Sequence, residues 1–192
     1  MATLKGSKTE INLMTSFAGE SQARNRYTFF ASMAKKEGFV LVSEIFTETA
    51  AQEKEHAELM FKCLQGGTVE IKAAFPAGVI GKTLDNLLAA AGGELEEWKD
   101  IYPSFAKTAR EEGFEDVAKM YEMIAVAEAF HEKRYRAFAE LVKSGAMFKR
   151  DKPVAWRCRN CGFPTAETCE APALCPACKH PRDYFEIAVQ TW

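Results

Sequence analysis

Apolar residues recur at steps of three and four over four long stretches of the chain, a spacing typical of amphipathic helices. Leu, Met, Ala, Glu and Lys dominate these stretches, and all are good helix formers. Glycines stand where three of the stretches end. The pattern predicts helices over residues 9–37, 39–65, 80–112 and 115–143, and therefore a mainly α-helical protein.

Two parts of the chain lack this pattern. Residues 68–79 are expected to be extended, and they are long enough to connect opposite ends of a helix pair. After about residue 150, prolines and cysteines replace the helix formers. We therefore expect a helical domain over residues 1–146 and a small, loop-rich domain over residues 153–192, with a linker near residues 145–154.

The helical part of the chain repeats itself. YTFFASMAKKEGF begins at Tyr27, and YPSFAKTAREEGF begins at Tyr102, 75 residues later. A duplicated helical hairpin of this kind packs as a four-helix bundle with one long crossover. The two tyrosines are expected either to donate hydrogen bonds to metal-binding carboxylates or to serve as ordinary aromatic core.

A glutamate–histidine pair of the form E-x-x-H recurs at the same offset, and each pair has a further glutamate on the preceding helix. Residues three apart share a helix face, so each pair can point into the bundle. The set is Glu20, Glu53 and His56 from the first hairpin, and Glu94, Glu128 and His131 from the second. A single E-x-x-H would indicate only a solvated helix face. Four converging carboxylates instead need cations, which predicts two divalent ions such as iron or manganese.

The second hairpin has two features that the first lacks. Glu97 shares a helix face with Glu94, whereas the matching residue is Ala23, so Glu97 is either a fifth carboxylate ligand or part of a solvated acidic face. The repeated tyrosine follows Glu20 by seven residues but Glu94 by eight. Helices often absorb such insertions as π-bulges at functional sites. We expect a bulge between Glu94 and Pro103.

Five of the six cysteines fall in the last 35 residues. Cys158 with Cys161, and Cys175 with Cys178, form two C-x-x-C pairs that can close a four-thiolate site. Such a site holds either a structural zinc or one redox-active iron. Cys169 lies between the pairs and fits neither.

Composition and charge exclude several functions. The net charge is -2 without an obvious basic face, so nucleic-acid binding has no electrostatic support. No apolar run approaches the ~20 residues that a membrane helix needs, and the N-terminus lacks a hydrophobic signal core. We expect a cytoplasmic protein without a membrane or nucleic-acid partner.

The chain resembles the rubrerythrin family over essentially its full length. The resemblance rests on FAGESQARNRY, EKEH, GGELEEW, AVAEAFHEKR and the paired C-x-x-C tail. It implies a ferritin-like di-iron bundle fused to a rubredoxin-like domain, and a peroxidase that reduces hydrogen peroxide to water. Lys179 departs from the rubredoxin pattern, which usually has glycine there.

The resemblance also implies the metal ligands. Two non-haem irons would be held by Glu20, Glu53, Glu94, Glu97, Glu128 and His131. His56 would exchange with Glu97 when the site is reduced. One rubredoxin-type iron would be held by Cys158, Cys161, Cys175 and Cys178, and zinc can replace iron in either site.

Two partners are implied as well. One is an electron-donor protein, which the sequence does not identify. The other is a second copy of the chain, in a homodimer that brings one rubredoxin-like domain near its partner's di-iron centre. The main alternative function is a ferroxidase or iron-handling protein, which the fused electron-transfer domain argues against. A structural protein with a zinc ribbon is a further alternative.

Overall fold

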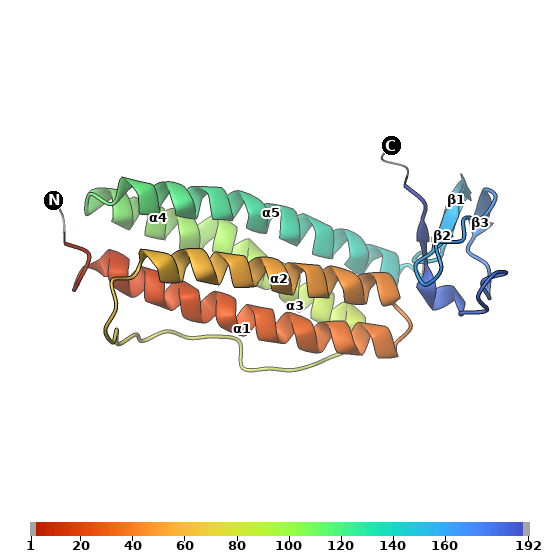
Figure 1. Ribbon diagram of the computed structural model, residues 1–192, viewed down its shortest axis with the longest axis horizontal. Coiled ribbons are helices and arrows are strands. Elements are labelled where there is room, and N and C mark those ends of the chain that lie inside the picture. Colours follow the sequence, from red (N-terminus) through yellow and green to blue (C-terminus); the bar gives the residue numbers. More distant parts are fainter. Residues whose placement is uncertain (1–2, 190–192) are drawn as a thin grey trace.

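The computed structural model describes residues 3–189 as a helical bundle with a small, strand-containing region at one end (Figure 1). The helices are α1 Lys8–Lys36, α2 Val40–Cys63, α3 Thr83–Glu96, α4 Tyr102–Glu111 and α5 Glu115–Lys143. All four predicted helical stretches are present, with α3 and α4 together forming the third. Residues 64–82 cross along the bundle without helix or strand, as predicted. No helix within residues 3–189 could cross a lipid bilayer.

The predicted bulge is confirmed. Between α3 and α4 the backbone forms a π-helix over Glu97–Ile101, in which the Tyr102 N–H bonds to the Glu97 carbonyl. The residue that lengthens the second repeat is absorbed there. As a result Tyr102 is buried in the bundle, as Tyr27 is in the first hairpin.

Two apolar clusters fill the bundle, one on each side of a polar layer. Phe46 and Leu87 are fully buried in the cluster nearer the α1–α2 turn, and Leu13 and Met60 in the other. Burial of apolar surface holds the four helices together at both levels. The layer between the clusters carries both E-x-x-H pairs, so charged side chains there are shielded from water at both ends.

The C-terminal region contains two small antiparallel sheets. Strand β1 Lys149–Val154 pairs with β3 Thr168–Glu170, and β2 Trp156–Cys158 pairs with β4 Phe185–Ile187. Trp156 and Phe185 are fully buried in its core. Residues 1–2 and 190–192 of the two predicted domains lie outside the described residues.

The prediction of a linker is wrong for residues 149–154, which form β1. The sequence KRDKPV shows no alternation of apolar and polar residues, because no side chain of this strand is buried. The strand is recognised only by its backbone pairing with β3.

The turn between α1 and α2 contacts the C-terminal region. The rings of Phe39 and Phe148 stack with their centroids 6.4 Å apart. Beside them, the carboxyl group of Asp183 packs against Gly38, which has a φ of +82°. This contact sets the position of the four-cysteine region against the end of the bundle.

Replacing Gly38 with alanine should destabilise the protein more than the same change at Gly145. Both glycines have positive φ, at +82° and +68°, where a Cβ costs about 1 kcal/mol. A Cβ on Gly38 would also lie 2.9 Å from the Asp183 carboxyl, whereas one on Gly145 meets nothing within 4 Å. We expect unfolding free energies lower by about 2 and about 1 kcal/mol respectively in urea denaturation. Equal losses would mean that Asp183 moves aside freely.

Candidate metal centres

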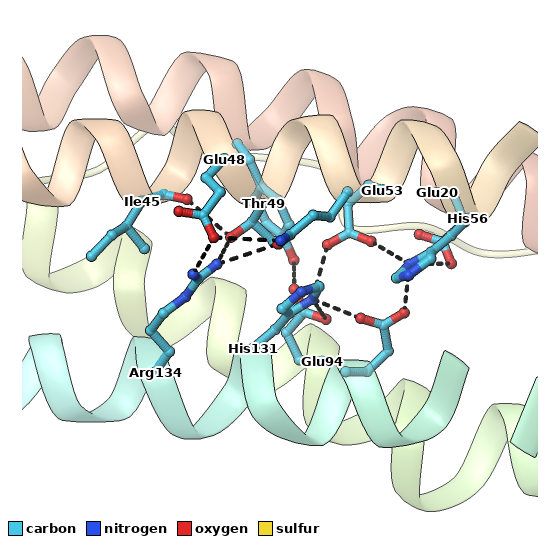
Figure 2. Close-up of polar contacts among 12 residues, drawn as sticks. Glu20, Ile45, Glu48, Thr49, Glu53, His56, Glu94, His131 and Arg134 are labelled. Carbon is cyan, nitrogen blue, oxygen red and sulfur yellow. Dashed lines mark hydrogen bonds and ion pairs between the residues drawn. The ribbon is translucent and has the colours of Figure 1, made fainter. Parts of the chain in front are cut away.

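Six of the predicted ligands converge in the polar layer from α1, α2, α3 and α5 (Figure 2). Their ligand atoms fall into two groups, in each of which all atoms lie within 4.8 Å of one another. The first group is Glu20, Glu53, His56 and Glu128, and the second is Glu53, Glu94, Glu128 and His131. The duplicated hairpins thus build two similar half-sites.

Glu53 and Glu128 belong to both half-sites. Glu53 Oε2 lies 3.0 Å from His56 Nδ1, while its Oε1 lies 3.4 Å from His131 Nδ1. Glu128 also contacts both histidines: its Oε1 lies 2.8 Å from His56 Nδ1, and its Oε2 lies 2.7 Å from His131 Nδ1. Each of these carboxylates presents one oxygen to each half-site, which suits a ligand that bridges two neighbouring cations.

Two tyrosines connect the hairpins across the layer. The Tyr27 hydroxyl donates to Glu94 Oε1 at 2.6 Å, and the Tyr102 hydroxyl donates to Glu20 Oε1. Each hairpin therefore orients a glutamate of the other. The rings also pack in the two apolar clusters, so each tyrosine is part of the aromatic core and also donates to a carboxylate of the layer. That these carboxylates bind metal stays a prediction.

Replacing Tyr102 with phenylalanine should weaken metal binding in the bundle about tenfold. The ring stays in its cluster, but Glu20 loses the donor that orients it, and such losses lower metal affinity about 10–100-fold. Tyr121→Phe is the matched control, because its ring centroid lies 5.5 Å from that of Tyr102 and its hydroxyl pairs with Ser16 at 3.2 Å. Competition with a coloured chelator measures both affinities. Equal affinities would show that Tyr102 is only a core aromatic.

Without a metal, protons balance the charge of the layer. Burial disfavours charge on His56 and His131, but the carboxylates of Glu128 and Glu53 beside them outweigh this effect. They raise the pKa values of the two histidines to about 10 and about 12 respectively. Burial would raise the pKa of Glu53, yet the two imidazoles lower it to about 2. Burial is the main cause that raises the pKa of Glu94 to about 8, and the negative charge of Glu53 adds to the rise. Metal binding must therefore displace protons from these groups.

Several carboxylate oxygens in the layer accept no hydrogen bond from any residue among 3–189. They are Glu20 Oε2, Glu53 Oε1, Glu94 Oε2 and both oxygens of Glu128. Buried carboxylate oxygens without donors are costly, and cations supply the missing partners. The donor set of four carboxylates and two imidazoles fits two ions such as iron or manganese.

Glu97 lies outside both half-sites. It is half-buried in the π-helix and, with Tyr102 and Arg26, lines a cavity of about 400 Å³ beside the layer. Burial, followed by the charges of Glu94 and Glu128, raises the pKa of Glu97. Glu97 therefore lies close enough to the half-sites for their charges to affect its pKa. Its role as a fifth carboxylate ligand stays a prediction.

Sequence reasoning missed Arg134. Its guanidinium donates to Glu48 Oε1 and Thr49 Oγ1, both at 2.7 Å, and so bridges α2 and α5 beside His131 (Figure 2). The signal was available, since residues three apart on a helix share a face. Trp98 was also missed, and its Nε1 donates to Glu132 at 2.8 Å, which ties the π-helix to α5.

The second candidate centre is the group formed by the two C-x-x-C pairs, Cys158, Cys161, Cys175 and Cys178. The Sγ atoms of Cys158 and Cys178 are 3.7 Å apart, as are those of Cys161 and Cys175. Metal–sulfur bonds of about 2.3 Å require tetrahedron edges of about 3.8 Å, so the four sulfurs fit one ion. Cys169 is exposed and lies outside this group.

The departure at Lys179 leaves the turn around the sulfurs intact. Gly162 and Lys179 follow the two pairs and have φ values of +78° and +60°. Their N–H groups donate to the carbonyls of Cys158 and Cys175 at 2.8 and 2.9 Å. The left-handed conformation explains why glycine is usual here, and Lys179 adopts it too.

Comparisons with known proteins identify the family. A sequence model described as rubrerythrin matches residues 12–139, and one described as the rubredoxin-like domain of rubrerythrin matches residues 156–186. The chain belongs to the rubrerythrin family. The rubrerythrin of Nitratidesulfovibrio vulgaris is 56% identical over 100% of both chains. That of Porphyromonas gingivalis is 57% identical over 96% of this chain and 92% of its own.

Solved structures agree with this membership of the rubrerythrin family. Nigerythrin in its fully reduced, all-ferrous state matches with a TM-score of 0.60 and 28% identity, covering 97% of this chain and 92% of its own. Bacterioferritin of Desulfovibrio desulfuricans has a TM-score of 0.63 over 71% of this chain and 81% of its own, and at 21% identity it shows the fold alone. The predicted fold, a ferritin-like helical bundle with a rubredoxin-like C-terminal region, is confirmed.

Proposed function

We propose that this protein is a non-haem di-iron peroxidase that reduces hydrogen peroxide to water. The observation that carries the proposal is the pair of half-sites that share Glu53 and Glu128, since it allows two cations to be neighbours in a buried layer. Converting one peroxide molecule to two of water takes two electrons and two protons. Two ferrous ions, when bound, supply one electron each.

The ligands in this proposal are the predicted ones: Glu20, Glu53, Glu94, Glu97, Glu128 and His131, with His56 replacing Glu97 on reduction. An anionic carboxylate suits the more charged ferric state, and a neutral imidazole suits the ferrous state. His56 is already placed between the two shared carboxylates, with its side chain only 12% exposed. Glu97 has a cavity beside it into which it can withdraw.

The four-cysteine group would hold one iron that returns electrons to the bundle one at a time. Cys161 is exposed and Cys178 is half-buried, which leaves one edge of the group accessible to an electron-donor protein. A bundle alone would stop after one peroxide molecule, because nothing would restore its ferrous state. Zinc in the four-cysteine group would have the same effect, since zinc is not redox-active.

We also infer that the protein acts as a homodimer, in the cytoplasm. The four-cysteine region lies beyond the end of the bundle (Figure 1), and α5 alone runs about 18 Å from His131 to Lys143. An antiparallel second copy would bring its four-cysteine group beside the layer. Met123, Val126 and Phe130 are 62–66% exposed on α5 near the layer, and such an apolar stripe supports a contact surface there.

The test is an optical spectrum with metal analysis, taken on anaerobically reconstituted protein before and after peroxide is added. We expect about three irons per chain, a bleached reduced form, and return of the ferric thiolate colour within the mixing time. Continued turnover must then follow when electrons are supplied. A colourless four-cysteine site that keeps zinc when iron is plentiful would favour the zinc-ribbon alternative. Peroxide consumption that uses up added ferrous ions would favour the ferroxidase.

A further inference from the structure

Arg26 on α1 is a half-buried cation beside the carboxylate layer. Its Nε atom is buried and has no hydrogen-bond partner among residues 3–189. Its guanidinium lies against α3, with Nη2 3.7 Å from the place that a Cβ would take on Gly93. The guanidinium carbon also lies 5.8 Å from the centroid of the Tyr27 ring, a cation–π contact that leaves Nε without a hydrogen bond. Buried polar groups are rarely left without hydrogen-bond partners, so the unpaired Nε requires an explanation.

The position of the guanidinium relates Arg26 to Glu97. Gly93 and Glu97 are one turn apart and share a helix face, so the guanidinium lies about one turn from the Glu97 side chain. Both residues line the cavity of about 400 Å³, one wall of which is the crossover segment at Phe75 and Pro76.

We propose that Arg26 is a positioning residue that receives the Glu97 carboxylate in this cavity whenever Glu97 is not bound to metal. The proposal rests on the function proposed above, in which Glu97 and His56 exchange. A carboxylate that leaves a cation needs both space and a countercharge, and here the cavity supplies the space and Arg26 the countercharge. In the first hairpin the residue that matches Glu97 is Ala23, which is buried. The combination of a fifth carboxylate, a cavity and a countercharge therefore occurs only at Glu97.

This role has a thermodynamic consequence that a purely structural role would not have. Arg26 stabilises the state in which Glu97 is off the metal, which is the reduced state. Its removal should favour the oxidised centre and lower the midpoint potential of the di-iron couple. We expect a shift equivalent to about tenfold in the ratio of oxidised to reduced centres, typical of coupling between nearby charged groups.

The experiment is a double-mutant cycle read out as the midpoint potential in a spectroelectrochemical titration. Arg26→Gln should lower the potential, and Arg26→Lys, which keeps the charge, should restore part of it. Arg24→Gln, which removes an exposed cation from the same helix, is the matched control and should leave the potential unchanged. In a Glu97→Gln background the Arg26→Gln change should have no further effect.

Two outcomes would overturn the proposal. An unchanged potential in Arg26→Gln would leave Arg26 without a link to the centre. An equal drop with and without Glu97→Gln would give Arg26 only a general electrostatic effect on the layer. Peroxide turnover by the unmodified protein is measured separately, so failure of the peroxidase function is distinguishable from failure of the Arg26 role.

Discussion

Replacing Glu128 with glutamine should remove both metal ions from the bundle while the four-cysteine group stays loaded. Glu128 faces both half-sites through its two oxygens, so its loss removes a predicted ligand and a negative charge from each. Glutamine keeps the volume of the side chain, so no cavity forms. We expect metal content to fall from about three irons per chain to about one. Peroxide turnover should fall at least about a hundredfold. Removing a hydrogen-bond partner of a metal ligand already costs up to about a hundredfold, and this variant loses the ligand itself.

The matched control is Glu140→Gln, which changes an exposed carboxylate three turns further along α5. It should keep all metal ions and full turnover. Loss of only one bundle metal in the Glu128 variant would contradict the shared-ligand arrangement, because it would assign Glu128 to a single half-site. Metal analysis of both variants, purified under the same conditions, decides between these outcomes.

Helix periodicity explains why most of the site could be predicted. Residues three apart on a helix must share a face, so Glu53 with His56 and Glu128 with His131 could be placed from spacing alone. The duplication then supplied their counterparts on the neighbouring helices. The π-helix was predictable for the same reason, since one extra residue between Glu94 and the repeated tyrosine breaks a register that both hairpins otherwise keep.

The features that sequence could not supply depend on contacts between helices. Helix spacing puts Arg134 on the face of His131, but nothing in the pattern gives its partner Glu48 on α2. Nor does the pattern place Arg26 against Gly93, because these two residues lie on different helices and do not follow the repeat. The separation of Glu97 from both half-sites is of the same kind, since helix spacing places Glu97 on the face of Glu94 but gives no distance to the ligands on the other helices. In each case the missing information is three-dimensional packing.

A second large effect is expected from Cys158→Ser, which should stop continuous peroxide turnover while leaving one turnover intact. The variant loses a buried cysteine of the four-cysteine group, and with it the proposed iron that would return electrons to the bundle. We expect the steady-state rate to fall at least about a hundredfold, since one missing ligand abolishes the tetrahedral site. Pre-reduced bundle iron should still react with one equivalent of peroxide at an unchanged rate in stopped flow.

Cys169→Ser is the control, because Cys169 is exposed and outside the group, and it should change neither rate. Wild-type protein with zinc in the four-cysteine group and iron in the bundle should behave as Cys158→Ser does, and this comparison does not depend on how the variant folds. Unchanged steady-state turnover in either form would show that electrons reach the bundle by another route.

Mixing the two inactive variants tests whether electrons cross between subunits. Cys158→Ser keeps an intact bundle, and Glu128→Gln keeps an intact four-cysteine group. In a dimer with transfer between copies, a mixed pair has one complete route, so random exchange in an equal mixture should restore about a quarter of full turnover. Mixing without recovery, once mass spectrometry shows that mixed pairs have formed, would place the route within one chain. The long path along α5 would then have to carry the electrons by itself.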